Sequence, residues 1–427
     1  MKYLTFAYLV FFVFCFIFSF RIIGAINSSM LVGGLCLALL MMRKKGVVVF
    51  KKTLSSVYVA KMLKFIYVLF FFSLFFPILH QSFDFYFTKV VLALLIQFIL
   101  GCFLWAFWKY ISNERKCYYD IEKIIIYAFI IQSMIQCIVS FTPSLQPFIF
   151  YFNNAESINE SYNLLFGTGV RGVALASGTG FSLSLGYGIA FIIYVKKYLL
   201  YKLSLINVLI GAILFVGIFF AGRTGFVGVG IASIYYFLDK NSGTLLTKIG
   251  KVFNLLFYLL LLCFVIYCIF IDFVNHLIDN VFPFAFEPLY NLFNNDSFET
   301  ASTNRLQEMW KVSITWDELF LGTGCYFDPL YPHTFYKQVD IGLFKNIFFW
   351  GIWGYILVLL FQYVQLYPLR FKLDKSDKYY LYAIFLFLLL LDLKAIALGL
   401  NKTAFSIILL IVFAYEKNIN NHSFCTK

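Results

Sequence analysis

Runs of apolar residues, each followed by a short polar stretch, make up most of the chain. A helix needs about 20 mostly apolar residues to cross the hydrocarbon core of a bilayer. Because lipid tolerates no open sheet edge, these runs predict an all-α, polytopic helical bundle that forms a single membrane domain over residues 1–427. About twelve runs are long enough to be candidate spans, at approximately 3–20, 22–42, 62–79, 90–108, 121–142, 173–195, 203–221, 224–238, 252–273, 345–366, 379–398 and 403–416.

Two of the segments between these runs, 143–172 and 274–344, are much longer than the others. Long loops in a compact protein are usually functional. Within the second loop, Asn304–Gln307 resembles the start of a helix, apolar residues then recur at helical spacing, and Gly322 ends the pattern. The sequence therefore predicts an amphipathic helix over about 305–320 that lies over the outer membrane face of the bundle.

Composition excludes several classes of protein. Hydrophobic residues make up 62% of the chain and charged residues 13%, whereas a soluble domain has about 25% charged residues. A soluble enzyme, a disordered protein and a disulfide scaffold are thus excluded, and the cysteines lie mostly inside apolar runs, so no disulfide framework is implied. The first apolar run lacks a convincing cleavage site and is expected to be a retained span, not a signal peptide.

The formal net charge of +13 comes from short basic clusters between apolar runs, not from one contiguous basic face. Nucleic-acid binding is therefore not expected. Basic clusters of this kind mark the cytoplasmic loops of membrane proteins, and with about twelve spans they predict that both termini are cytoplasmic and both long loops are on the outer side. The clusters are Arg43–Lys45, Lys51–Lys52, Arg115–Lys116, Lys196–Lys197 and Arg370–Lys372.

The seven arginines are distributed differently from the 27 lysines. Arg21, Arg171, Arg223 and Arg305 fall on the predicted outer side, where the topology signal gives no reason for them. Guanidinium binds phosphate through a planar fork, and the glycines beside Arg171 and Arg223 let backbone N–H groups approach an anion closely. We expect Arg171, Arg223 and Arg305 to share an anionic ligand; the alternative is that each reaches lipid phosphates or pairs with a loop carboxylate.

A series of short motifs lies around the long outer loop. The motifs are Arg171 followed by Ala174–Gly186, then Gly222–Gly225, Asn304–Arg305 with Trp310, Leu319–Gly324, and Asp340 with Trp350–Gly354. In order and spacing, residues 165–365 resemble the O-antigen polymerase and O-antigen ligase superfamily. The resemblance implies a GT-C-like helical bundle in the bacterial inner membrane, with the long loop in the periplasm.

One position bears on the choice between the two activities. Ligases of this superfamily carry a histidine followed by Asn, Ser or Gln, then nine residues, then a glycine, two further residues, and finally Gly, Thr or Tyr. In this chain the frame aligns Asp340–Ile341 with Gly351–Gly354, so an aspartate takes the place of the histidine. The resemblance therefore favours a polymerase. His333, seven residues upstream of Asp340, could replace the histidine in space, which keeps the ligase alternative open.

The resemblance implies a specific reaction. Polymerases of this superfamily join oligosaccharide repeat units that are linked to undecaprenyl pyrophosphate, and a sugar hydroxyl displaces the lipid pyrophosphate from an anomeric carbon. The hydroxyl needs a general base, for which Asp340 is our first candidate and His333 the second. Alternatively, Asp340 caps the following span or pairs with Lys337 or Lys345, and His333 is an ordinary loop residue.

The leaving pyrophosphate needs cations around it. Arg171, Arg223 and Arg305 are the candidates. Lys394 is a further one, because it lies with Asp392 inside an apolar run, where ionisable residues are costly and usually functional. Its alternative role is to snorkel to the membrane surface. No histidine has spaced partners for a metal site, and neither a metal nor another cofactor is expected.

The expected partners are the lipid-linked oligosaccharide, membrane lipid and, as a further candidate, a chain-length regulator protein. A flippase for lipid-linked oligosaccharides is the alternative from a different class. A flippase would carry charges along a central cavity and short loops on both sides. Here the deep charges lie near the outer end and one outer loop dominates, which favours chemistry at the membrane surface.

Overall fold

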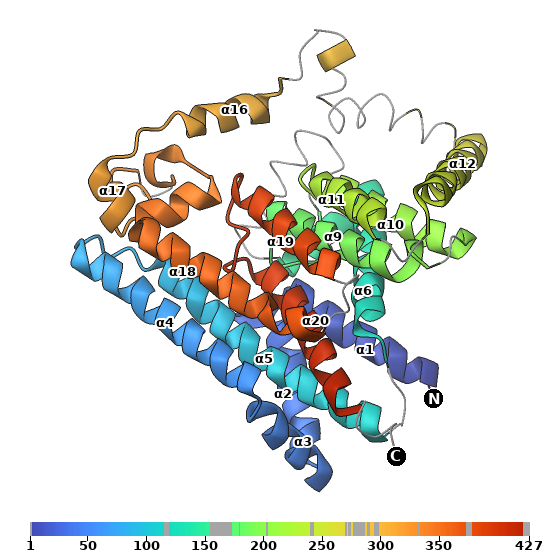
Figure 1. Cartoon of the computed structure of the whole chain (residues 1–427), viewed down its shortest axis with the longest axis horizontal. Coiled ribbons are helices and arrows are strands. Elements are labelled where there is room, and N and C mark those ends of the chain that lie inside the picture. Colours follow the sequence, from blue (N-terminus) through green and yellow to red (C-terminus); the bar gives the residue numbers. More distant parts are fainter. Residues whose placement is uncertain are drawn as a thin grey trace. The chain divides into compact units, whose positions relative to one another are not determined.

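The computed structural model shows an all-α protein (Figure 1), and the described residues include one short two-stranded hairpin. It describes residues 2–114, 119–153, 173–178, 180–201, 204–239, 243–269, 271, 275, 287, 291–293, 299–331, 334–372 and 378–421. The chain divides into two compact units, which we describe separately. Unit 1 comprises Met1–Ser28, Glu122–Ala301 and Asp374–Phe387, and unit 2 comprises Ser29–Ile121, Ser302–Leu373 and Leu388–Lys427.

The elements assigned mainly to unit 1 are α1 (Lys2–Phe18), β1 (Arg21–Ile23), β2 (Ile26–Asn27), α6 (Ile121–Phe141), η1 (Pro143–Leu145), α7 (Gln146–Tyr151), α9 (Phe181–Tyr194), the π-helical η2 (Val195–Leu199), α10 (Leu205–Ala221), α11 (Gly225–Leu238), α12 (Leu245–Ile269) and the first part of α19 (Lys378–Asp392). The elements assigned mainly to unit 2 are α2 (Ser28–Met41), α3 (Lys44–Leu54), α4 (Val57–Leu79), α5 (Tyr86–Glu114), α16 (Ala301–Trp310), α17 (Trp316–Leu321), η3 (Tyr336–Gln338), α18 (Gly342–Lys372) and α20 (Lys402–Asn421).

Four helices in the described part of the chain are long and apolar enough to cross a membrane. They are Val57–Leu79, Tyr86–Glu114, Ile121–Phe141 and Gly342–Leu369. These helices indicate a multi-pass membrane protein, in agreement with the sequence. Several other apolar helices are shorter, and the total of about twelve spans stays a prediction.

Helices α4, α5, α18 and α20 form the core of unit 2, and α4, α5 and α18 run side by side in Figure 1. Trp105 of α5 stacks on Phe413 of α20, with ring centroids 5.7 Å apart. Phe361 of α18 stacks on Phe405 of α20 at 6.2 Å. In lipid such contacts stabilise through van der Waals packing, since the lipid tails are as apolar as the side chains. They join helices that are far apart in the sequence.

In unit 1, α9 packs closely against α10 and α11. A Cβ atom added to Gly228 of α11 would lie 2.4 Å from the Cα atom of Gly188 in α9. Such close backbone approach is why small residues are enriched between membrane helices. The buried Tyr187 hydroxyl donates a hydrogen bond of 2.6 Å to Gln136 of α6. The glycine- and serine-rich run predicted as a span therefore has a clear packing role.

The structure has two short helices where the sequence predicts one helix over about 305–320. Helix α16 ends at Trp310 and α17 begins at Trp316. The second start is fixed by a capping box, in which Thr315 accepts from the Glu318 backbone N–H and the Glu318 side chain accepts from the Thr315 N–H. Asn304–Gln307, which the sequence predicts as a helix start, instead lies inside α16. Gly322 caps the end of α17 with φ 71°.

The predicted span 379–398 also differs from the structure, because α19 ends at Asp392. The Asp392 carboxylate accepts hydrogen bonds from the backbone N–H groups of Ala397 at 2.9 Å and Leu398 at 3.2 Å. A short polar side chain that bonds nearby backbone in this way competes with helical hydrogen bonding. The chain therefore leaves the helix and forms a turn over 393–401 before α20 begins.

Candidate functional site

The predicted site residues fall into three groups. Arg171 and His333 lie outside the residues that the structure describes. Arg223 belongs to unit 1. The third group, which belongs to unit 2, consists of Arg305, Asp340 and Lys394.

The glycine motif Gly322–Gly324 docks onto an interruption in α18. At Gly351 the backbone leaves helical geometry with φ 68°, a conformation that favours glycine. In an unbroken helix, the Phe348 and Phe349 carbonyls would accept hydrogen bonds from backbone N–H groups four residues later. The interruption removes these donors. These carbonyls instead accept hydrogen bonds of 2.6 and 2.9 Å from two consecutive backbone N–H groups of the motif, beginning at Thr323. Two of the motifs that carry the resemblance therefore meet at their backbones.

This docking leaves no room for larger residues. A Cβ atom added to Gly351 would lie 2.4 Å from the Phe320 carbonyl oxygen, and one added to Gly322 would lie 2.6 Å from the Gly351 nitrogen. Real Cβ atoms essentially never come so close to another heavy atom. Both positions also have positive φ, so each requires glycine for two separate reasons.

The turn between α4 and α5 holds the next part of the loop. The Asp84 carboxylate accepts hydrogen bonds from the backbone N–H groups of Tyr326 at 2.8 Å and Phe327 at 2.9 Å. The Tyr86 ring stacks on the Tyr326 ring with centroids 3.9 Å apart. Asp84 was not among the predicted residues. Its signal in the sequence is that it is the one acid in the short polar break between two long apolar runs.

Asp340 is an accessible carboxylate held by a buried lysine. Its side chain is 45% exposed, and Oδ1 lies 2.5 Å from Nζ of Lys345, whose side chain is only 6% exposed. The same Nζ lies 3.3 Å from the Tyr326 hydroxyl and 3.2 Å from the centre of the Phe335 ring. A buried cation needs such compensation from a carboxylate and from aromatic faces.

The pairing of Asp340 with Lys345 was one of the alternatives to a role as general base. The structure contains this pair. The two roles are compatible, because the lysine fixes the position of the carboxylate from the buried side and leaves it accessible to a ligand. Lys345 lies in an apolar run, and its aromatic surroundings come from a loop whose path the sequence does not give.

A second ion pair joins α17 to the same loop. Lys337 Nζ lies 2.7 Å from Oε1 of Glu318, and the Tyr336 hydroxyl donates a hydrogen bond of 3.0 Å to the same oxygen. Burial acts to raise the pKa of the Glu318 carboxyl, but hydrogen bonds from Lys337, the Thr315 backbone and Tyr336 outweigh it, so the pKa lies below the usual 4.5. Burial and the neighbouring Glu318 raise the pKa of Tyr336 to about 12.

Arg223 lies in the short turn between α10 and α11. Its Nη1 atom lies 2.6 Å from Oε2 of Glu287, and about a quarter of each side chain is exposed. The Ser184 hydroxyl donates to the Gly222 carbonyl at 2.8 Å, and the Thr224 hydroxyl donates to Ser184 at 2.9 Å. The turn is thus tied to α9. Pairing with a carboxylate was the alternative weighed for this arginine, and a phosphate ligand would have to replace Glu287.

The other two predicted cations, which belong to unit 2, are exposed. Arg305 lies in α16 and Lys394 lies in the turn that follows α19. Asp392, two residues before Lys394, is fully buried and accepts hydrogen bonds from backbone N–H groups of that turn. In the part of the chain that the structure describes, no group of three or more side chains could hold a metal ion.

Comparisons with protein-family models, curated proteins and solved structures find no match to this chain. The resemblance to the O-antigen polymerase and ligase superfamily therefore rests on the motifs themselves. A function for the chain has to be inferred from those motifs and from the geometry of the loop that carries them.

Proposed function

We propose that this protein is a membrane glycosyltransferase that polymerises a bacterial surface polysaccharide. It joins undecaprenyl-pyrophosphate-linked oligosaccharide repeat units at the periplasmic face of the inner membrane. In this proposal about twelve spans form a GT-C-like bundle with both termini in the cytoplasm. Segments 143–172 and 274–344 are periplasmic, and a chain-length regulator is a candidate partner.

The observation that carries the proposal is the setting of Asp340. Its carboxylate is accessible but is held by the buried Lys345. The loop before it is fixed where two glycine motifs meet, at Gly322–Gly324 and Gly351. A catalytic group held in one position by its surroundings loses little free energy to reorganisation during reaction. These features support a reactive carboxylate on a rigid platform.

In the proposed reaction, the oxygen of an acceptor sugar hydroxyl attacks the anomeric carbon of the lipid-linked chain. A new glycosidic C–O bond forms as the C–O bond to pyrophosphate breaks, and the electron pair leaves with the lipid pyrophosphate. The hydroxyl proton passes to the Asp340 carboxylate, a step that typically contributes about 10²–10⁴-fold in rate. His333 is the second candidate for this role.

The leaving pyrophosphate is stabilised by Arg171, Arg223, Arg305 and Lys394. Removing one preorganised donor of this kind costs about 3–4 kcal/mol of transition-state stabilisation. For Arg223, binding of the pyrophosphate replaces the ion pair with Glu287. A carboxylate that occupies the guanidinium in the absence of substrate keeps the side chain near the turn.

The test uses purified protein, a synthetic lipid-pyrophosphate-linked repeat unit and a chelator, with products resolved on a gel. We expect a metal-independent ladder of polymers. The ladder should be lost in Arg171→Ala, Arg223→Ala and Arg305→Ala, and it should persist in the matched control Arg43→Ala, which lies in a predicted cytoplasmic cluster.

Two other outcomes would contradict the proposal. Transfer of the glycan only after a lipid A-core acceptor is supplied would identify a ligase. Movement of the lipid-linked oligosaccharide across a liposome membrane, without any new glycosidic bond, would identify a flippase.

A further inference from the structure

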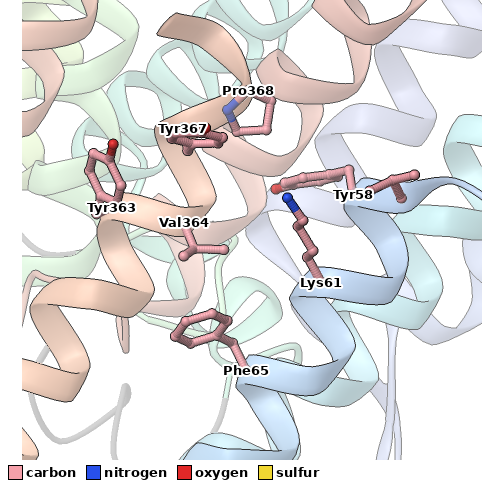
Figure 2. Close-up of a pocket in the computed structure, with 8 residues that line it drawn as sticks. Tyr58, Lys61, Phe65, Tyr363, Val364, Tyr367 and Pro368 are labelled. Atoms are coloured by element: carbon pink, nitrogen blue, oxygen red, sulfur yellow. The ribbon is translucent and has the colours of Figure 1, made fainter.

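A groove lies between α4 and α18 of unit 2 (Figure 2). Its volume is about 510 Å³, within the range of about 300–1,000 Å³ that is typical of pockets for small ligands. The residues that line it are Val57, Tyr58, Lys61, Phe65, Tyr363, Val364, Tyr367 and Pro368. None of these residues belongs to the proposed glycosyltransferase site.

The groove runs from the ends of the two helices toward their middle. Val57 is the first residue of α4, and Pro368 lies four residues before the last residue of α18. Phe65 is eight residues into α4, which places it about 12 Å farther along the helix at 1.5 Å per residue. In Figure 2, Phe65 lies at one end of the groove and Pro368 at the other, with Val364 between them. The end with Val57 is therefore at the membrane surface if both helices cross the bilayer.

Lys61 supplies a cation one turn inside that end. The side chain is exposed, and its Nζ atom lies 5.9 Å from the centre of the Tyr367 ring. No carboxylate among the described residues forms an ion pair with it. Tyrosines lie on both sides, Tyr58 on α4 and Tyr363 and Tyr367 on α18, as is usual at the level of lipid headgroups.

The helix that precedes α4 adds positive charge beside the groove. Helix α3 is short, with exposed lysines and a partly covered row of apolar residues at Val47, Val49 and Phe50. This composition is typical of helices that lie in the interface and bind anionic lipid. Only two residues separate α3 from Val57. Its lysines are Lys44, Lys45, Lys51 and Lys52, of which Lys45 forms an ion pair of 3.3 Å with Glu114 of α5.

We propose that the groove binds one anionic glycerophospholipid. The phosphate lies at Lys61 between the tyrosines, and an acyl chain follows the groove past Phe65 and Val364. The lining residues include no acid that would receive the ammonium group of a zwitterionic headgroup. The charge of Lys61, and of Lys51 and Lys52 in the last turn of α3, therefore favours a lipid with net negative charge. This site is separate from the proposed catalytic function.

The test is native mass spectrometry of the purified full chain with phosphatidylglycerol or phosphatidylcholine of identical acyl chains. One lysine near an anionic headgroup contributes about 1 kcal/mol, so Lys61→Met should lower retention of phosphatidylglycerol about fivefold. The matched control is Lys64→Met, since Lys64 is exposed on the same helix but does not line the groove. The Lys64→Met variant should retain about as much phosphatidylglycerol as the unsubstituted protein.

A second pair of variants tests the groove itself. Val364→Trp should fill it and displace the phosphatidylglycerol, whereas Leu360→Trp, at an exposed position of the same helix outside the groove, should not. Equal retention of the two lipids, equal losses in the two lysine variants, or equal losses in the two tryptophan variants would each overturn the proposal. A matched melting temperature for the members of each pair excludes misfolding as the cause.

Discussion

Two interruptions of apolar helix in unit 2 are stabilised in opposite ways. At Gly351 in α18, the freed carbonyls accept hydrogen bonds from the backbone of a distant segment that begins at Thr323. Between α19 and α20, the turn over 393–401 is stabilised by buried side chains. Asp392 accepts from two backbone N–H groups there, and Gln362 accepts from the Gly399 N–H at 2.8 Å.

The interruption at Gly351 is a docking point for another backbone segment, whereas the turn over 393–401 is stabilised by side chains of its own helices and neighbours. Unsatisfied backbone groups cost several kcal/mol each in lipid, so both interruptions must be paired. Where the partner is another backbone segment, the interruption fixes the position of a loop, here the loop that leads to Asp340. Where the partners are buried side chains, the turn is complete in itself. We therefore assign the first interruption to the site and the second to stability.

The largest effect on stability should come from replacing the glycine at the first interruption. Gly351→Ala places a Cβ atom where the Phe320 carbonyl oxygen lies and imposes a positive φ on alanine. We expect a loss of about 3 kcal/mol or more in stability, measured as the unfolding free energy in detergent.

The matched control for that substitution is Gly34→Ala. Gly34 lies in helix α2 with nothing near its added Cβ atom, so its stability should be unchanged or slightly higher. Equal stabilities of the two variants would show that the Gly351 interruption does not depend on glycine.

A smaller effect is expected at the second interruption. Asp392→Ala leaves two buried backbone N–H groups without their acceptor, at a cost of about 2–3 kcal/mol in unfolding free energy. Asp392→Asn keeps an acceptor oxygen and should recover a large part of this loss. Similar losses in both variants would mean that the negative charge matters and not the hydrogen bonds, which would weaken the assignment of Asp392 to the turn.

The smallest of the stability effects concerns Glu318, which ties α17 to the site loop. Because its pKa is lowered in the folded state, its stabilisation is present above the unfolded value near 4.5 and is lost as pH falls toward the folded pKa. Glu318→Gln should therefore be less stable than the unsubstituted protein by about 1 kcal/mol at neutral pH.

That difference should shrink below about pH 4.5, as the unsubstituted protein loses its own stabilisation. The measurement is the melting temperature of both proteins from neutral to acidic pH. A difference that stays constant over the whole range would show that the carboxylate charge of Glu318 contributes nothing.

The sequence predicts the helical class and the multi-pass character, because these depend only on run length and hydrophobicity. It also marks Gly322 and Gly351 within motifs. It could not show that these two glycines meet, since that contact depends on the path of the loop between them. The extent of the 305–320 helix was overestimated because helical periodicity persists across the break that Thr315 and Glu318 create.

The sequence likewise predicted some residues of the site but not the contacts that surround them. Asp340 was identified from its position in a motif, but its partner Lys345 was one of two candidates, with Lys337 the other. The aromatic surroundings of Lys345 come from Tyr326 and Phe335, which lie 19 and 10 residues before it in a loop whose backbone Asp84 holds at Tyr326. Contacts between a loop and a helix follow no sequence period, so hydrophobic patterning carries no signal for them.

The most direct test of the proposed role of Asp340 is the rate of polymer formation in Asp340→Asn against Asp317→Asn. Asp317 is an exposed aspartate in α17, close in sequence and outside the proposed reaction. Each variant is supplied with the same lipid-pyrophosphate-linked repeat unit, and rates are compared per folded protein, because Asp340→Asn also removes the carboxylate that pairs with the buried Lys345. We predict a rate about 10²-fold lower or more for Asp340→Asn and an unchanged rate for Asp317→Asn. Equal rates in the two variants would contradict a catalytic role for Asp340.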